Sequence, residues 1–278
     1  MHVDGRGRQH HHQRRVGPVR EPLLAPLFDD PGRAAVICDF DGTLAPIVAD
    51  PAQARPLPGA VELLHRLAVS YAAVAVVSGR PLAFLAEHLR LTAAGRLRAW
   101  GAYGLEPWGH GAGVGPDRLA PWRLRVAEVA ARADAEAPPG VLIERKGLSV
   151  TVHYRTAPAA QRWARRFAGE QAARTGLALH PARMSEELRP PVAVDKGTVV
   201  SEVGAGMAAV CFVGDDLGDL PAFAALDTLS ATAGVICVKV AVASSEVPAA
   251  LLEGADLVVD GPGGALELLT SLVPDGSG

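Results

Sequence analysis

The sequence predicts an α/β fold, in which a parallel sheet flanked by helices carries a smaller inserted α+β domain. Apolar runs typical of buried parallel strands occur at 34–38, 72–77 and 208–213, and segments with helical spacing lie between them. The stretch 109–189 departs from this alternation, because it reads as two helices and a small antiparallel sheet. With 278 residues, 49% of them hydrophobic, the chain is long enough to bury a full core.

The first segment, residues 1–20, is polar and rich in Gly, Arg and His, so we expect a disordered leader. His10, His11 and His12 have no scaffold to fix a coordination geometry, which favours a solvated basic tail over a metal site. The segment lacks the apolar stretch of a signal peptide, and no apolar run in the chain approaches the roughly 20 residues of a membrane helix. We therefore expect no membrane partner.

The run 34–38 is followed by two acids one residue apart, Asp39 and Asp41, and then by Gly42 and Thr43. The acids lie at the carboxyl end of the predicted strand, the edge where open α/β sheets bind ligands. Backbone N–H groups in the turn around Gly42 are suited to cradle an anion. Converging carboxylates repel each other, so the pair is expected to hold a divalent cation, share a proton or do both. The alternative, a capping turn, would not require a buried strand.

Helical spacing over 59–67 leads to the strand at 72–77, which ends in a Ser-Gly-Arg-Pro turn beginning at Ser78. Ser78 therefore also lies at a strand end, where its hydroxyl can donate to a phosphoryl oxygen. Alternatively it caps the helix predicted over 82–89. The two roles are compatible.

The inserted stretch has its own pattern of elements. Helical composition over 121–137 ends at Pro-Pro-Gly, strands are predicted at 141–144 and 148–154, and a second amphipathic helix at 157–176. The insert also offers charged side chains suited to sugar hydroxyls, although each alone is equally compatible with a solvated strand face. These residues are Lys146, Arg155, Glu187 and Arg189.

Two further motifs lie in the last third of the chain. Asp-Lys-Gly at 195–197 opens the helical stretch 198–203, so Lys196 lies near a helix start, where its charge and the helix dipole favour an anion. A lone Lys of this kind is otherwise a solvated surface group. The apolar run 208–213 leads into Gly-Asp-Asp-Leu-Gly-Asp at 214–219, so acids again follow a buried strand.

Charge and cysteine content restrict the partners and the compartment. The net charge of −3 gives no basic footprint for nucleic acid or an anionic membrane, so we expect small-molecule partners and no nucleic acid. Cys38, Cys211 and Cys237 lie on or beside apolar runs without CxxC spacing, which favours buried reduced thiols over disulfides or zinc ligands. A cytoplasmic location is the simplest that fits them.

Four ordered motifs, DFDGT, VVSGR, DKG and GDDLGD, resemble those of the haloacid-dehalogenase-like phosphatases. They span Asp39 to Asp219. The resemblance implies a Rossmann-like parallel-sheet core over 21–108 and 190–278, and an inserted α+β cap over 109–189.

The same resemblance implies catalytic roles. Asp39 is the expected nucleophile, forming an aspartyl-phosphate, and Asp41 is the expected general acid and base. Ser78 and Lys196 are expected to clamp the transferring phosphoryl group. The expected cofactor is Mg²⁺, since all the ligands are oxygens, with Asp41 acting through its backbone carbonyl. The predicted metal-site residues are Asp39, Asp41, Asp215, Asp216 and Asp219, and the contributions of the last two are not ranked.

A narrower resemblance lies in the middle of the chain. The segment Glu144 to Arg155 and the run Glu-Leu-Arg-Pro-Pro at 187–191 resemble the sugar-recognising cap of trehalose-6-phosphate phosphatases. GAYGLE at 101–106 resembles their GxHGxE, with Tyr103 where His is usual, and GDDLGDL departs from the commoner GDDxTDE. The resemblance implies a substrate site made of Gly42, Thr43, Gly79, Arg80, Glu106, Glu144, Lys146, Arg155, Glu187 and Arg189.

We therefore expect a Mg²⁺-dependent phosphatase that hydrolyses trehalose 6-phosphate to trehalose and phosphate, a step of trehalose biosynthesis. The two departures leave an alternative open, a phosphatase or phosphomutase acting on another sugar or cyclitol phosphate. A non-catalytic interaction domain is disfavoured, because every reactive position of the motif set is filled. The expected partner is a small-molecule sugar phosphate, and a trehalose-phosphate synthase is a candidate protein partner.

Overall fold

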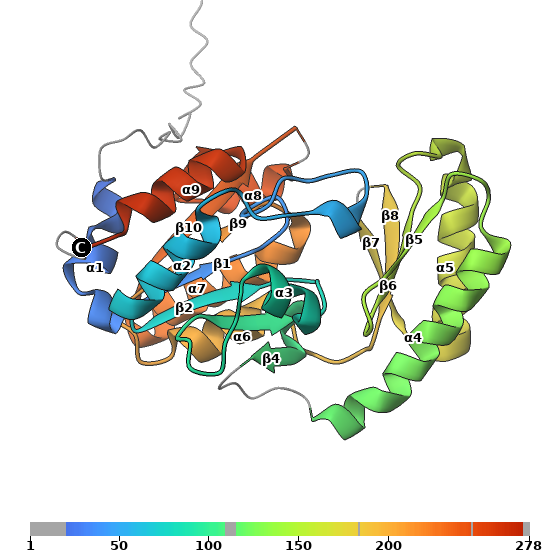
Figure 1. Cartoon of the computed structure of the whole chain (residues 1–278), viewed down its shortest axis with the longest axis horizontal. Helices are drawn as coiled ribbons and strands as arrows, with labels where there is room; N and C mark the ends of the chain where they lie inside the picture. The colour runs from blue at the N-terminus through green and yellow to red at the C-terminus, as the bar shows by residue number, and fades with distance from the viewer. Residues whose placement is uncertain (1–20, 109–114, 183, 246, 275–278) are drawn as a thin grey trace, which may run out of the picture.

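The computed structural model of the protein describes residues 21–108, 115–182, 184–245 and 247–274. Within these ranges the strands form a seven-stranded sheet and a separate four-stranded sheet (Figure 1). The leader predicted at 1–20 and the start of the predicted insert, 109–114, lie outside the described residues.

The larger sheet has the strand arrangement of a doubly wound α/β fold, which confirms the predicted fold class. Its strands are β1 (Ala34–Cys38), β2 (Ala73–Val77), β3 (Arg98–Gly101), β4 (Glu106–Trp108), β9 (Ala209–Gly214), β10 (Ile236–Ala243) and β11 (Leu257–Asp260). Their order is β11-β10-β9-β1-β2-β3-β4, all parallel except β4. The chain order reverses between β1 and β9, and such a switch point leaves a crevice for ligands at the carboxyl ends of the strands.

Helices cover both faces of this sheet, as its continuous apolar strands require. The helices are α1 (Ala25–Asp29), α2 (Ala60–Ser70), α3 (Leu82–His88), α6 (Lys196–Gly204), α7 (Leu220–Ala233), α8 (Ala249–Gly254) and α9 (Gly261–Ser271). Along β1, Val36 and Cys38 pack into an apolar cluster with α1, α2, α3 and α9, whereas Ala35 and Ile37 pack with α6, α7 and α8. Every residue of β1 is therefore buried.

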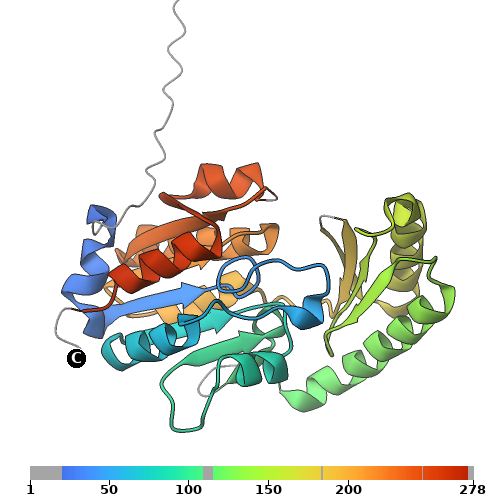
Figure 2. The ribbon, with the colours of Figure 1, turned by 45° about the horizontal axis from the view of Figure 1, so that its top comes forward.

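The four-stranded sheet is formed by the insert, defined here as the described residues from 115 to 189. Its elements are α4 (Pro116–Glu136), β5 (Leu142–Arg145), β6 (Val150–His153), α5 (Gln161–Thr175), β7 (Ala178–Ala182) and β8 (Ser185–Arg189). The strands are antiparallel in the order β5-β6-β8-β7. Val150, Val152 and Phe167 share an apolar cluster with α4 and α5. The helices lie on the outside, and the other face of the sheet is turned toward the larger sheet (Figures 1 and 2).

Helix boundaries differ from the sequence prediction by a few residues, and the start of α4 differs most. The helix expected over 121–137 begins at Pro116, so Pro121 lies inside α4. A proline there removes one N–H···O=C bond from the first turns. The residues around it are mostly exposed, and water can satisfy the carbonyl group that is left free.

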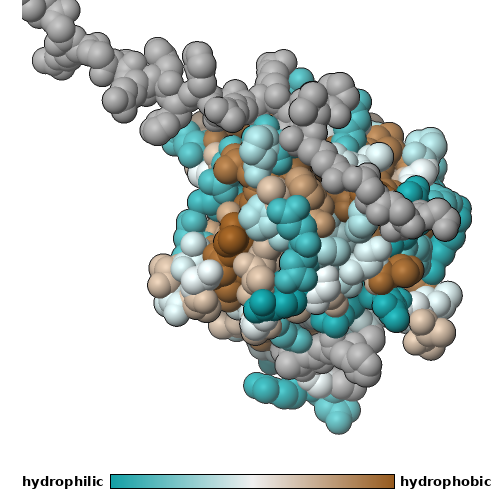
Figure 3. Space-filling model, turned by 90° about the vertical axis from the view of Figure 1, so that its left-hand side faces the viewer, coloured by the Kyte–Doolittle hydropathy of each residue, from teal (hydrophilic) through white to brown (hydrophobic). Residues whose placement is uncertain are grey.

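The end of the larger sheet away from the insert carries no predicted site residue. On this side, patches of apolar residues lie between hydrophilic ones (Figure 3). A cavity of about 810 Å³ lies at the amino ends of β2 and β3, and its lining includes Tyr71, Arg98 and Trp108. Among the described helices, none is long and apolar enough to cross a membrane.

Candidate active site

The turns that follow three neighbouring strands bring the predicted catalytic residues to one edge of the larger sheet. Asp39 follows β1, Ser78 follows β2 and Asp215 follows β9, while Lys196 is the first residue of α6. All four side chains are buried, which is rare for Asp and Lys unless they are paired or hold a ligand.

Lys196 is the charged centre of this group. Its Nζ lies 2.9 Å from Asp39 Oδ1 and 2.7 Å from Asp219 Oδ1. Burial alone would lower the pKa of Lys196, but the negative charges of Asp219 and Asp39 outweigh burial and raise it well above its ordinary value. The amine is therefore a permanent cation next to the predicted nucleophile.

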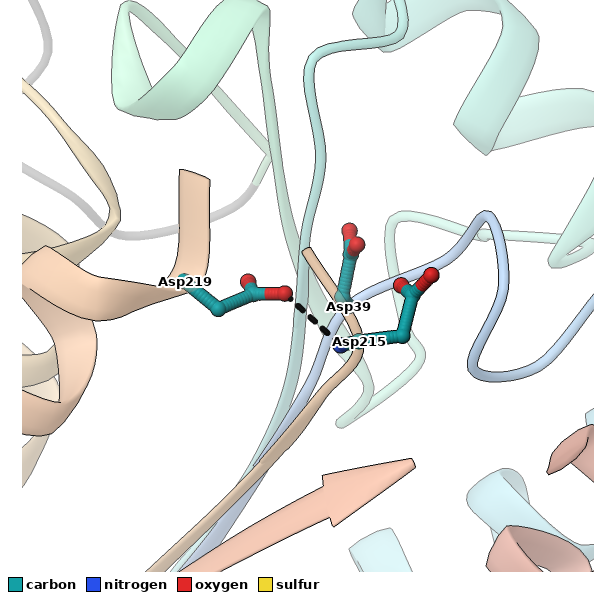
Figure 4. A group of neighbouring side chains, drawn as sticks. All are labelled: Asp39, Asp215 and Asp219. Atoms are coloured by element: carbon teal, nitrogen blue, oxygen red, sulfur yellow. Dashed lines mark hydrogen bonds between the residues drawn. The ribbon is translucent and has the colours of Figure 1, made fainter. Parts of the chain in front are cut away.

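Three of the five predicted metal-site residues converge. One carboxylate oxygen from each of Asp39, Asp215 and Asp219 lies within 4.8 Å of the others. The Asp39 and Asp215 carboxylates point to the same side, whereas Asp219 reaches toward the Asp215 amide (Figure 4). Asp219 Oδ2 accepts from the backbone N–H groups of Asp215 and Asp216, at 2.9 and 3.0 Å, and its Oδ1 accepts from Lys196. Both oxygens of Asp219 are thus engaged.

Burial and mutual repulsion act on the acids of this cluster. Burial raises the pKa of Asp39 well above its ordinary value, although Lys196 opposes the shift. Burial, followed by the charge of Asp39, raises the pKa of Asp215 to about 9. Lys196 alone therefore does not offset the negative charge gathered here, and a further cation would favour the ionised carboxylates.

The side chains of the remaining two predicted metal-site residues lie elsewhere. Asp216 is exposed, and its Oδ1 accepts from Gly218 N at 2.8 Å, which caps the short helix η6 (Leu217–Asp219). Asp41 is held by Arg80, whose Nε and Nη2 each donate at 2.7 Å to one of its carboxylate oxygens. The Asp41 carboxylate is thus engaged by Arg80, and the predicted contact of its backbone carbonyl with a metal stays a prediction.

The turn after β1 approaches Asp215 very closely. Gly42 has φ +75°, and a Cβ at this position would lie 1.9 Å from Asp215 Oδ2, so no other residue fits without rearrangement. Gly42 N donates to Ala45 O at 2.7 Å, so this N–H closes the turn and is not free to cradle an anion. The neighbouring Thr43 is fully buried, and its Oγ1 has no partner among the described residues.

Ser78 does not cap the following helix, contrary to the alternative considered from the sequence. Helix α3 begins at Leu82, after Pro81, and no side-chain cap precedes it. Ser78 Oγ instead accepts from Arg80 N at 3.2 Å. Glu106 instead accepts a hydrogen bond at the start of α3, from the backbone N–H of Leu82 to its Oε2 at 2.8 Å. Glu106 thereby has a local structural partner as well as its predicted place in the substrate site.

Arg80 joins the larger sheet to the insert. Besides Asp41 it contacts Glu144 of β5, with its Nη1 3.0 Å from Glu144 Oε1. Glu144 Oε2 lies 2.9 Å from His153 Nε2 and 3.5 Å from Lys146 Nζ. The predicted sugar-binding acid Glu144 is therefore surrounded by three basic groups from two parts of the chain.

A second link between the two sheets is formed by Tyr103 and Glu187. Tyr103 Oη donates to Glu187 Oε2 at 2.7 Å, and Ser149 Oγ donates to Glu187 Oε1 at 2.7 Å. Lys146 Nζ lies 3.5 Å from Glu187 Oε1, and Arg189 Cζ lies over the Tyr103 ring, 4.3 Å from its centroid. Tyr103 has φ +60°, and its ring fills the space that a Cβ on Gly79 would take. Gly79 thus permits the Tyr103 contact.

The contacts of Glu144 predict a pH-dependent stability. Burial alone would raise the pKa of Glu144, but the hydrogen bond from His153 and the charges of Lys146 and Arg80 lower it to about 2. The folded protein favours the ionised form of Glu144. Its carboxylate therefore stabilises the fold fully above about pH 4.5, and this stabilisation is lost as the pH falls toward 2. We expect the melting temperature of the wild type to fall more steeply over this interval than that of Glu144→Gln. Glu253→Gln, at an exposed site, should keep the wild-type slope, and equal slopes in all three proteins would contradict the prediction.

The family model described as Trehalose-phosphatase matches residues 37–251. A protein from Mycolicibacterium paratuberculosis named Trehalose-phosphate phosphatase is 37% identical over 211 residues, 69% of this chain and 51% of that protein. A Mycobacterium leprae protein of the same name is 34% identical over 212 residues, 69% of this chain and 47% of that protein. This chain belongs to the trehalose-phosphatase family. It spans about half the length of the curated relatives it matches.

A solved structure agrees with this trehalose-phosphatase assignment at the level of the fold. The C-terminal domain of C. albicans trehalose-6-phosphate phosphatase superposes with a TM-score of 0.74 at 23% identity, covering 94% of this chain and 99% of that one. At this identity the likeness establishes the shared fold.

The sequence analysis of this trehalose-phosphatase family member missed two residues of the insert sheet that contact the predicted sugar-binding acids. Ser149 contacts Glu187, and His153 contacts Glu144. Strand alternation could have found them, because positions 149, 151 and 153 share the face opposite the apolar Val150 and Val152. Arg155, predicted on the same grounds as Lys146, is exposed beyond the end of β6.

Proposed function

We propose that the protein hydrolyses trehalose 6-phosphate to trehalose and inorganic phosphate, as an enzyme of trehalose biosynthesis. One observation carries the proposal. The buried pair of Asp39 and Lys196 lies at the edge of the larger sheet that the polar face of the insert contacts through Glu144 and Glu187. This arrangement supports a single site that combines a centre for phosphoryl transfer with side chains suited to sugar hydroxyls. The names of the relatives support the same substrate.

Mg²⁺ fits the residues present, because Asp39 and Asp215 point to the same side and offer oxygen ligands. Asp215 Oδ1 is buried and has no partner among the described residues, as expected of a ligand atom. We propose these two carboxylates and the Asp41 carbonyl as the protein ligands. Asp219, with both oxygens engaged, holds Lys196 and the backbone of the loop instead. A bound Mg²⁺ would neutralise the phosphoryl oxygens and keep the carboxylates ionised.

Asp39 is the proposed nucleophile. Its carboxylate oxygen attacks the phosphorus, the bond from phosphorus to the sugar oxygen breaks, and an aspartyl-phosphate forms. Lys196, already in contact with Asp39, and the buried hydroxyl of Ser78 are the proposed donors to the oxygens of the transferring group. Their positions are fixed by the start of α6 and the end of β2.

Asp41 is the proposed acid and base. It protonates the departing sugar oxygen, which leaves as a hydroxyl group. The resulting carboxylate takes a proton from the water that attacks the phosphorus, and Asp39 is released together with phosphate. Because Arg80 donates to both Asp41 oxygens, one of these contacts has to be exchanged for the sugar oxygen during the reaction.

The proposed division of labour assigns the sugar to a cap over 109–189 and the phosphoryl group to a core over 21–108 and 190–278. It is supported by the face of the insert that carries Glu144, Lys146 and Glu187, because core residues contact that face while α4 and α5 cover the other. We do not extend the sugar-binding role to Arg155, which is exposed.

A phosphatase or phosphomutase for another sugar or cyclitol phosphate is the second candidate. Tyr103 favours this candidate, because it stands where the GxHGxE motif usually has His and it contacts the proposed sugar-binding Glu187 directly.

The cytoplasm is the proposed location, supported by three free cysteines of which two are buried. A trehalose-phosphate synthase is the proposed functional partner, since it would supply the substrate.

Phosphate release from a substrate panel tests the function. We expect kcat/KM for trehalose 6-phosphate to exceed that for glucose 6-phosphate and an inositol phosphate by at least about tenfold. The reason is that two linked sugars make more contacts with the cap than one ring does. p-Nitrophenyl phosphate reports on the core alone. A preference for the inositol or single-ring phosphate would select the second candidate, and no hydrolysis of any ester would contradict both.

Metal removal gives an independent prediction. EDTA should abolish hydrolysis of both trehalose 6-phosphate and p-nitrophenyl phosphate, because the Asp39 and Asp215 carboxylates then repel each other and the phosphoryl group. Excess Mg²⁺ should restore it, and Zn²⁺ should do so poorly, since the site has no His or Cys ligand among the described residues. Full activity after exhaustive chelation would rule out the metal.

A further inference from the structure

Thr151 carries a buried hydroxyl that nothing in the described structure satisfies. The residue lies on β6 with 3% of its surface exposed, and its Oγ1 has no hydrogen-bond partner among the described residues. Val150 and Val152 pack against the helices of the insert, so Thr151 lies on the opposite face, the one turned toward the larger sheet. Buried hydroxyls in folded proteins are normally paired, and one left unpaired requires an explanation.

The neighbours of Thr151 are the two proposed sugar-binding acids. Cross-strand pairing places it directly opposite Glu144 on β5 and directly opposite Glu187 on β8. Residues paired in this way share a face, with Cβ atoms about 5 Å apart. The three side chains therefore form one row across the middle of the insert sheet.

Neither acid accepts a hydrogen bond from Thr151, and all four carboxylate oxygens have other partners. Glu144 Oε1 accepts from Arg80, and its Oε2 pairs with His153. Glu187 Oε1 accepts from Ser149, and its Oε2 accepts from Tyr103. The Thr151 hydroxyl is thus the one polar group of this row without a partner among the described residues.

The contacts on either side fix what Thr151 faces. Arg80 reaches Glu144 from the turn after β2 and also holds Asp41, while Tyr103 reaches Glu187 from the turn after β3. Thr151 lies between these two bridges, because it pairs across the strands with both Glu144 and Glu187. A carboxylate has about four lone-pair positions, so a sugar hydroxyl placed here can pair with Thr151 and still donate to a flanking acid.

We propose that Thr151 is a specificity-determining residue that hydrogen-bonds a hydroxyl group of the sugar part of the substrate. The inference rests on the proposed function, and it adds a neutral hydroxyl to the charged side chains of Glu144, Lys146 and Glu187. Such a hydroxyl can discriminate between substrates. A sugar that lacks a hydroxyl group at the matching position leaves the buried Thr151 hydroxyl unpaired, and it therefore binds less tightly.

The test compares Thr151→Val, which keeps the shape and removes the hydroxyl, with Thr151→Ser, which keeps the hydroxyl. For Thr151→Val we expect the ratio of kcat/KM for trehalose 6-phosphate to that for p-nitrophenyl phosphate to fall about tenfold, mainly through KM. Thr151→Ser should retain most of the ratio. The melting temperature of unliganded Thr151→Val should equal or exceed that of the wild type, because an unpaired buried hydroxyl is replaced by a methyl group.

Thr175→Val is the matched control, since Thr175 is a buried threonine of the same insert whose Oγ1 donates to Gln171 O at 2.7 Å. It should lower the melting temperature and leave the substrate ratio unchanged. An unchanged ratio in Thr151→Val, or a lowered melting temperature with equal losses on both substrates, would overturn the inference. If the wild type prefers another ester of the panel, the proposed function fails separately, and the same variants are compared on that ester.

Discussion

Replacing Asp39 by Asn is expected to lower kcat by at least about a thousandfold while the fold stays intact. Asn has the shape of Asp but no negative charge with which to attack phosphorus. Asp39 is 4% exposed, and its Oδ1 lies 2.9 Å from Lys196 Nζ. Asp219 holds the same amine at 2.7 Å, so Lys196 keeps an anionic partner in the variant and we expect it to fold.

Phosphate release from trehalose 6-phosphate measures the effect, and circular dichroism with thermal melting verifies the fold. Asp29→Asn is the matched control, because Asp29 is exposed at the end of α1, and it should be fully active. Acid quenching should trap a phosphoenzyme in the wild type and none in Asp39→Asn. Turnover above a few per cent of wild type in the Asn variant would refute Asp39 as the nucleophile.

Replacing Lys196 by Met is expected to impair stability and catalysis together. Met has a similar length and no charge, so Asp39 and Asp219 lose the cation that lies between them. Removing one partner of a buried ion pair costs about 3–5 kcal/mol in the free energy of unfolding. The loss of a donor to the transferring group should lower kcat by a further factor of about 100–1,000 in the molecules that remain folded.

Denaturant unfolding and single-substrate kinetics separate these two effects. Lys239→Met is the matched control, because Lys239 Nζ pairs with the largely exposed Asp227 at 2.6 Å. A surface pair of this kind contributes about 1 kcal/mol or less, and no catalytic loss is expected from it. Unfolding of Lys196→Met at the same denaturant concentration as the wild type would show that the ion pairs of Lys196 with Asp39 and Asp219 do not stabilise the fold.

The catalytic edge could be predicted from the sequence because each of its residues directly follows or begins a strongly patterned element. Asp39 comes immediately after the strand at 34–38, and Lys196 is the first residue of α6. Parallel strands align their carboxyl ends, so residues far apart in the chain are brought together by topology alone. The strand at 34–38 was predicted residue for residue, because five consecutive apolar residues fit a strand buried on both faces.

The side-chain partners could not be predicted in this way. Asp216 and Asp219 are both acids of one loop, yet Asp219 turns inward to Lys196 while Asp216 caps η6 at the surface. The difference depends on how the loop closes in three dimensions, since adjacent turns offer competing backbone N–H groups to each carboxylate. Arg80 likewise pairs with Asp41, 39 positions earlier, and with Glu144, 64 positions later.

By itself the sequence determined the doubly wound fold, the inserted α+β unit, the family and the acids at the end of β1, because these follow from short-range apolar periodicity and contiguous motifs. Tertiary structure alone decided which acids converge, that Arg80 and Tyr103 reach Glu144 and Glu187 of the insert, and that Thr151 lies unpaired between those two acids. The physical reason is that hydrogen bonds and ion pairs between distant segments depend on strand register and side-chain direction, which no local pattern of residues records.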